Sequence, residues 1–174
     1  EPDPKLRKQL DGIVDAVVRA QDSDGYLNTY FQGPLAERRY TEERRSHELL
    51  CTGQLIEAGL AYYEATGDRK LLDAGTSAAR HFMSRFGPNK APILDGHPGL
   101  GMALADLFRL TPDGDFLEFS RYLLMAEGLP AYPFLKEWGY VAGWRDSELR
   151  YMFSEMPFTK RHELSGNGFR AMYG

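Results

Sequence analysis

The chain has 174 residues, a net charge of −4, 43% hydrophobic residues and 26% charged residues. This is the composition of an ordinary globular domain that is long enough to bury a hydrophobic core. It lacks the basic face expected of a nucleic-acid binder and the run of about 18 apolar residues expected of a membrane span. Its one cysteine, Cys51, excludes an internal disulfide framework and a cysteine-rich metal site.

Apolar residues recur at spacings of three and four in several segments, as they do in amphipathic helices. The spacing predicts helices at about 5–21, 42–66 and 70–86, a fourth beginning near 98, and a fifth at about 114–127. The first carries the apolar stripe Leu6, Leu10, Ile13, Val14, Val17 and Val18. We expect a loop at 26–40, a long irregular insertion at 128–160 and a further helical start near 163. Since no run of alternating β-branched residues predicts a strand, the fold class is all-α.

Two turns between these helices are similar in sequence. Thr66-Gly67-Asp68 leads into one helix, and Thr111-Pro112-Asp113 leads into another 45 positions later. Gly67 lies where a C-cap glycine is expected. A repeat of this size indicates stacked helical hairpins, and both an open solenoid and a closed toroid satisfy it.

Two histidines lie where helices begin. His47 precedes the apolar part of the second helix, and His97 directly precedes the fourth. In a toroid of helical hairpins, alternate helices line the inside and their N-terminal ends gather at one mouth. Because a neutral imidazole donates and accepts a hydrogen bond at once, both histidines suit a sugar hydroxyl. The alternative is that each only caps or packs at its helix start.

Other residues whose side chains could take part in catalysis or binding have simpler interpretations. Asp22 and Asp24 could be a carboxylate pair for acid–base catalysis, but such clusters more often form turns. Cys51 is expected to be buried and inert, and a Cys–His nucleophile pair with His47 is disfavoured because no carboxylate is clearly placed to orient the histidine. His81 and His162 favour structural or surface roles. The aromatic residues at 26–31 and 132–144 could stack on a sugar or cover a core.

Four segments, in order, resemble one family. They are AQDSDGYL (20–27), SHELLCTGQLIEAGLAYYEATG (46–67), DGHPGLGMALADLFRL (95–110) and GNGFRAMY (166–173). The chain is similar in these segments to the β-L-arabinofuranosidases, glycoside hydrolase family 127. The resemblance implies that residues 1–174 are a single domain, the N-terminal portion of an (α/α)6 toroid built from helical hairpins. The catalytic C-terminal part of the barrel and the β-rich domains are expected to lie outside the chain.

The resemblance also implies a reaction and a site. The family hydrolyses β-L-arabinofuranosyl linkages with retention, using a zinc-bound cysteine as nucleophile and a glutamate as acid/base. Both are expected downstream, so no catalytic residue or metal ligand is assigned here, and this fragment alone is expected to be inactive. His47 and His97 match family histidines that contact the sugar. We expect a sugar or oligosaccharide as ligand, zinc only in the full-length enzyme, and neither nucleic acid nor membrane as partner.

This chain departs from the family pattern at four positions. Asn167 and Gln54 stand where the family has histidines, and Gly99 and Gly101 stand where it has acidic residues. The exact sugar and linkage therefore stay open, as do oligomeric state and compartment. Alternatives are another (α/α)6 sugar enzyme, such as an epimerase or an unsaturated-uronyl hydrolase, and a non-catalytic helical-repeat module.

Overall fold

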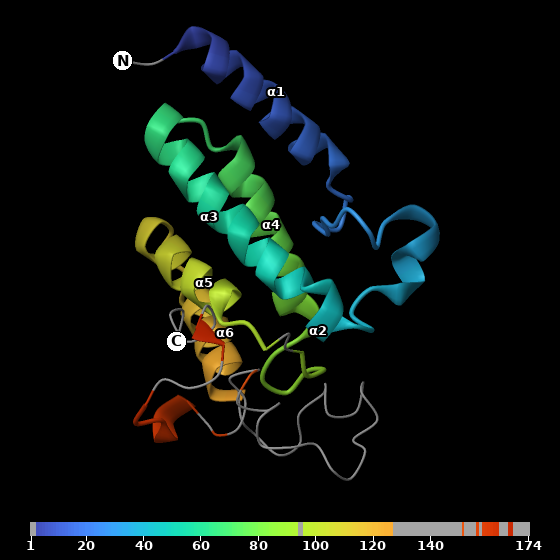
Figure 1. Cartoon of the computed structure of the whole chain (residues 1–174), viewed down its shortest axis with the longest axis vertical. Helices are drawn as coiled ribbons and strands as arrows, with labels where there is room; N and C mark the ends of the chain where they lie inside the picture. Colours follow the sequence, from blue (N-terminus) through green and yellow to red (C-terminus); the bar gives the residue numbers. More distant parts are fainter. Residues whose placement is uncertain are drawn as a thin grey trace.

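In the part of the chain that the structure describes, the named elements of secondary structure are all helices or 3-10 turns (Figure 1). The structure is a computed structural model that describes residues 3–93, 96–126, 151, 156, 158–163, 167 and 168. Its elements are α1 (Pro4–Ala20), a 3-10 turn (Gly33–Arg38), α2 (Glu43–Ser46), α3 (Glu48–Thr66), α4 (Lys70–Arg85), α5 (Gly99–Leu110), α6 (Gly114–Ala126) and a second 3-10 turn (Phe158–Lys160). Among these described residues no strand forms beyond one isolated bridge between Phe86 and Ala91, so the all-α prediction is confirmed.

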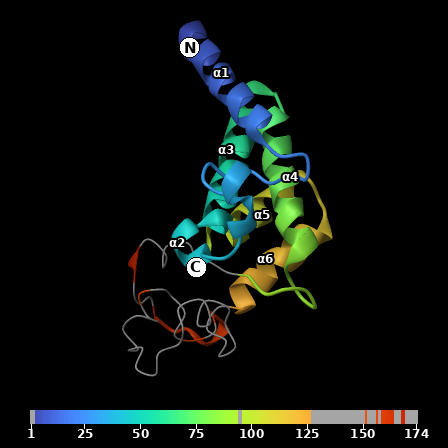
Figure 2. The ribbon, with the colours of Figure 1, turned by 90° about the vertical axis from the view of Figure 1, so that its right-hand side faces the viewer.

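The helices stack as antiparallel hairpins (Figure 1). α3 pairs with α4 and α5 pairs with α6, while α3 also packs along α5 and α1 packs on α4. The view turned by 90° shows the chain running from the end of α1 through residues 21–42 to α2 at the lower end of α3 (Figure 2). α3 and α5 run in the same direction, so their N-terminal ends lie at one end of the molecule.

Glycines allow the helices to approach closely. A β-carbon on Gly59 of α3 would lie 2.7 Å from the Leu72 Cα of α4, and one on Gly75 of α4 would lie 3.1 Å from the Ile56 Cα. At the other interface, a β-carbon on Gly53 would lie 2.9 Å from the Leu100 Cα of α5. These contacts leave no room for a larger residue, and they fix the register of α3 against both neighbours.

The two turns that look alike in the sequence also form alike. The Asp68 carboxylate accepts the Lys70 N–H at 3.0 Å, and the Asp113 carboxylate accepts the Asp115 N–H at 3.0 Å. Both therefore cap the start of the second helix of a hairpin. Gly67 has a φ of 72° and ends α3 as the predicted C-cap. The 45-residue repeat thus corresponds to two consecutive hairpins.

The core lies between α3, α4, α5 and α6. Its fully buried side chains include Ile56, Leu72, Leu104, Leu107 and Phe116. α1 contributes much less: Val14 is buried beside Tyr62 and Leu71, whereas Leu6 is 62% exposed and Ile13 is 64% exposed. The predicted six-residue stripe of α1 is therefore covered along one edge only, because α1 contacts the described helices through the line of Val14, Val17 and Val18.

Two predictions fall outside the part of the chain that is described. The irregular insertion at 128–160 is represented only by Tyr151, Met156 and the 3-10 turn Phe158–Lys160. The helical start near 163 is represented only by Glu163, Asn167 and Gly168. No helix among the described residues has the length and apolar character that a membrane span requires.

Candidate functional site

His47 forms a sharp joint between α2 and α3. Its backbone is left-handed, with φ 52° and ψ 39°. Its N–H donates to the Glu43 carbonyl at 2.8 Å, and its carbonyl accepts the Cys51 N–H at 2.9 Å. The sequence predicted one continuous helix over 42–66, and this was wrong at His47, because a single left-handed residue ends one helix and begins the next. A non-glycine residue in this conformation persists only where its surroundings hold it, and such residues cluster at functional sites.

His97 lies at the corresponding position before α5. Gly96 precedes it with φ 70°, and Pro98 follows it at the helix start. The imidazole is buried, with 6% of the residue exposed. The Gly99 N–H points at His97 Nδ1 over 3.4 Å, a long hydrogen bond that makes Nδ1 the acceptor and leaves the proton of a neutral ring on Nε2.

The starts of α3 and α5 are in contact. A β-carbon on Gly99 would lie 3.1 Å from Leu50 Cδ1 and 3.4 Å from His97 Nδ1, so Leu50 and His97 border the same space. Leu50 lies three residues after His47, within the first turn of α3. One helix turn further, Gly53 meets Leu100. The two histidines therefore begin neighbouring helices of the same direction, as the hairpin repeat predicted.

Two buried carboxyl groups flank His47, and sequence reasoning did not single them out. Glu43 is 1% exposed, and its carboxylate accepts the Leu49 N–H at 3.4 Å. Glu48 is 2% exposed, and it accepts from the Tyr26 hydroxyl, the Tyr40 N–H and the Ser46 hydroxyl. Their sequence signal was weak: glutamates beside a histidine at a helix start are usually exposed.

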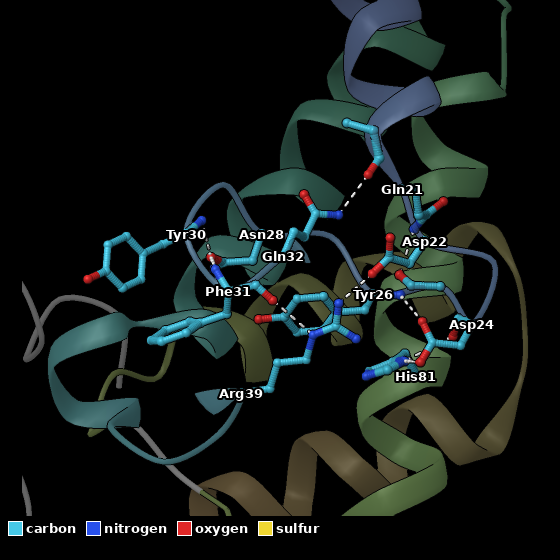
Figure 3. Close-up of polar contacts among 12 residues, drawn as sticks. Gln21, Asp22, Asp24, Tyr26, Asn28, Tyr30, Phe31, Gln32, Arg39 and His81 are labelled. Atoms are coloured by element: carbon cyan, nitrogen blue, oxygen red, sulfur yellow. Dashed lines mark hydrogen bonds and ion pairs between the residues drawn. The ribbon is translucent and has the colours of Figure 1, made fainter. Parts of the chain in front are cut away.

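Asp22 and Asp24 lie in the turn that follows α1 (Figure 3), and both carboxylates form ion pairs with arginine side chains. The Asp22 N–H donates to the Tyr26 carbonyl at 2.9 Å, and its carboxylate pairs with Arg39. Asp24 Oδ1 accepts the Tyr26 N–H at 3.2 Å, while Oδ2 pairs with Arg85 at 3.0 Å. Both carboxylates thus have local backbone and ion-pair partners, which favours the turn interpretation over the acid–base pair.

The aromatic residues of the same loop are divided. Tyr26 and Phe31 are buried in the core cluster, and Tyr30 is exposed. In the 26–31 segment, core cover is therefore the main role, and Tyr30 alone offers an open aromatic face. The aromatic residues at 132–144 lie outside the described residues.

His81 is a buried structural histidine of α4. Its Nδ1 lies 2.9 Å from the Asp24 carbonyl, so Nδ1–H donates there, and Nε2 accepts from the Tyr40 hydroxyl. Burial lowers the pKa of His81, and Arg85, with Nη1 3.2 Å from Nδ1, lowers it further. Burial also raises the pKa of Tyr40 to about 12, which keeps this hydroxyl protonated. His162, in contrast, is exposed, as predicted for a surface position.

Cys51 differs from its predicted environment. It is exposed on α3. The expectation of a buried cysteine is therefore wrong. Within the described residues, no group of three or more His, Cys, Asp and Glu side chains could hold a metal ion. We therefore assign no zinc ligand to this part of the chain.

The departures from the family pattern lie in different surroundings. A side chain at Gly99 would contact Leu50 and His97, whereas one at Gly101 would point toward Ser120 and Leu124 of α6. Gln54 is exposed on α3, and Asn167 is half-buried. Three of these departures, Gln54, Gly99 and Gly101, lie on α3 and α5. Of these three, only Gly99 lies directly beside a candidate sugar-binding histidine.

Comparison with known proteins defines the class. The model of the GH127 β-L-arabinofuranosidase catalytic domain matches residues 1–172. The non-reducing end β-L-arabinofuranosidase of Bifidobacterium longum subsp. longum is 39% identical over 133 residues, which cover 73% of this chain and 20% of that protein.

Solved structures agree with this match. The GH127 β-L-arabinofuranosidase of Geobacillus stearothermophilus T6 superposes with a TM-score of 0.90 at 34% identity, covering 98% of this chain and 28% of its own. A second GH127 β-arabinofuranosidase has a TM-score of 0.79 at 28% identity, covering 99% of this chain and 26% of its own.

The fold is thus that of a glycoside hydrolase catalytic domain, part of an (α/α)6 barrel. The chain belongs to the GH127 β-L-arabinofuranosidase family. It spans 20–28% of the length of these relatives.

Proposed function

We propose that this chain forms part of the sugar-binding mouth of a longer enzyme that hydrolyses β-L-arabinofuranosyl linkages. The observation that carries the proposal is the placement of His47 and His97 at the starts of α3 and α5. These helices run in the same direction and touch through Gly53 and Leu100. Two imidazoles at adjacent helix starts can bind neighbouring hydroxyls of one sugar ring.

The chemistry of each imidazole supports this role. With Nδ1 accepting from Gly99, His97 in its neutral form carries its proton on Nε2, and this nitrogen is the donor that the proposal assigns to a sugar oxygen. His47 lies on the left-handed backbone joint between α2 and α3, so it belongs to the regular turns of neither helix. These groups bind and orient the sugar; they are not proposed as nucleophile or acid/base.

The reaction itself belongs to the longer protein in this proposal. We propose hydrolysis with retention, in which a nucleophile and an acid/base outside the described residues act in turn, with zinc bound there. We expect the 174-residue chain alone to release no arabinose.

The test is hydrolysis of an aryl β-L-arabinofuranoside by the full-length protein, with and without a zinc chelator. The proposal predicts release of L-arabinose that is first formed as the β anomer, seen by NMR, and that falls when zinc is removed. First formation of the α anomer would contradict retention. An isomerised sugar without hydrolysis would instead identify an epimerase on the same barrel.

A further inference from the structure

The joint at His47 is held from both sides by buried carboxyl groups. Before the joint, Glu43 caps the first turn of α3 through the Leu49 N–H. After the joint, Glu48 makes hydrogen bonds to three groups that come from different segments of the chain. Because buried carboxyl groups are costly unless they are hydrogen-bonded, this arrangement indicates that the joint must keep one geometry.

The three partners of Glu48 come from separate segments. The Tyr26 hydroxyl donates to Oε2 at 2.5 Å from the loop after α1. The Tyr40 N–H donates to Oε1 at 3.0 Å from the segment before α2, and the Ser46 hydroxyl donates to the same oxygen at 3.3 Å from the last residue of α2. We call Glu48, Tyr26, Tyr40 and Ser46 the Glu48 cluster. Through these hydrogen bonds, the segment from Tyr26 to α2 is bonded at three points to Glu48, the residue that follows His47.

Tyr26 is itself fixed in place. The Arg39 guanidinium lies over its ring at 3.8 Å, and Arg39 also donates to the Phe31 carbonyl at 2.9 Å (Figure 3). Burial and the hydrogen bond to Glu48 raise the pKa of Tyr26, so its hydroxyl stays a donor. The cluster therefore links His47 to a rigid part of the loop rather than to a mobile side chain.

We propose that Glu48 and Tyr26 are positioning residues that hold His47 in its left-handed conformation and thereby present its imidazole to the sugar. This inference rests on the proposed function for its kinetic consequence. Its structural part, that the Glu48 cluster holds the joint, does not depend on the substrate.

The structural part is tested by hydrogen exchange in the full-length protein. Tyr26→Phe removes one hydroxyl and keeps the buried ring, and Glu48→Gln is a second variant of unchanged size. Both should accelerate exchange of the His47 and Cys51 amides, which frame the joint, by about fivefold or more, the equivalent of one lost hydrogen bond.

A matched control lies at the other end of α3. The Tyr62 hydroxyl also donates to a carboxylate, that of Asp11, at 2.7 Å. Tyr62→Phe removes a comparable bond far from His47, so it should leave the exchange of these two amides unchanged. Equal acceleration by Tyr62→Phe, or none by Tyr26→Phe and Glu48→Gln, would overturn the inference.

The kinetic part is tested by a double-mutant cycle on the aryl β-L-arabinofuranoside. Tyr26→Phe should raise KM about fivefold in the otherwise unchanged protein. In a His47→Ala background it should change KM little, because a positioning residue acts only through the group that it positions. If Tyr26 had a purely structural role, Tyr26→Phe would lower stability equally in the unchanged protein and in the His47→Ala background. Its effect on KM would then be the same in both.

The outcomes separate the two proposals. If His47→Ala leaves KM unchanged while the amide exchange behaves as expected, the sugar contact of His47 is wrong and the positioning of the joint stands. If His47→Ala raises KM but Tyr26→Phe is fully additive with it, the sugar contact stands and the positioning inference is wrong.

Discussion

At the scale of single residues, the left-handed backbone of His47 lowers the stability of the protein but sets the position of the imidazole. A left-handed conformation costs a residue with a β-carbon about 1–2 kcal/mol. His47→Gly removes that cost, so we expect the free energy of unfolding to rise by about 1 kcal/mol while KM for the arabinofuranoside also rises, because the imidazole is lost. Denaturant unfolding and steady-state kinetics of the full-length protein measure the two effects.

Asn89 supplies the control for this change. It also has a positive φ, of 63°, but lies in an exposed turn after α4. Asn89→Gly should relieve the same kind of strain, to a smaller extent since asparagine tolerates this conformation, and should leave KM as it was. A rise in KM for Asn89→Gly, or lower stability for His47→Gly, would contradict this account.

His81 should make stability depend on pH near neutrality. Its folded pKa is lowered, first by burial, from an unfolded value of 6.5; the Asp24 carbonyl and carboxylate oppose this, while Arg85 and Arg39 add to it. Below about pH 6.5 the unfolded state therefore binds a proton that the folded state does not, so stability falls as pH falls. Lowered carboxyl pKa values, such as that of Asp11 through its hydrogen bond from Tyr62, affect stability mainly below about pH 5.

The variant His81→Gln isolates this contribution. Unfolding free energies at about pH 7.5 and about pH 5 should differ less for the variant than for the unchanged protein. An equal loss in both proteins would show that His81 is not buried in its neutral form.

At the scale of helices, the glycines of α3 decide how closely its neighbours pack. Gly59→Ala would place a β-carbon 2.7 Å from the Leu72 backbone, and we expect it to destabilise the protein by about 1–3 kcal/mol. Gly12→Ala on α1 meets no atom within 4 Å and should stabilise by about 0.5–1 kcal/mol, because alanine favours the helix. Thermal unfolding compares the two, and effects of the same sign would contradict the packing described.

The helices themselves were predictable from the sequence to within a few residues. Their apolar periodicity, the C-cap Gly67 and the paired caps Asp68 and Asp113 are local signals, and local signals determine where helices begin and end. The break at His47 was not predictable in this way. It depends on Glu48 binding Tyr26 and Tyr40, which are distant in sequence, and no periodic pattern records a contact of that kind.

Burial was harder to predict than helix position. The apolar stripe of α1 and the single thiol of Cys51 both suggested inner faces, yet Ile13 and Cys51 are exposed. Periodicity identifies an apolar face but not which neighbour covers it. His47 and His97 could be identified as candidate site residues because they stand at helix starts. Their adjacency follows from the hairpin repeat rather than from either sequence motif alone.

At the scale of the whole molecule, the parallel course of α3 and α5 brings their starts to one end of the stack (Figure 1). Every further hairpin of an (α/α)6 barrel adds another helix start to that end. The described hairpins supply His47 and His97 to it, and the proposed function assigns the reacting groups to other parts of a longer protein. In this account His47 and His97 recognise the sugar, and the Glu48 cluster holds His47 in place.

The most direct test of that account is kcat/KM of the full-length protein on the aryl β-L-arabinofuranoside for His47→Ala, His97→Ala and the exposed control His162→Ala. We expect losses of about 10- to 100-fold for the first two, each the equivalent of a hydrogen bond to substrate, and no change for the third. Values within about twofold of the unchanged protein for both His47→Ala and His97→Ala would contradict a sugar site at the starts of α3 and α5.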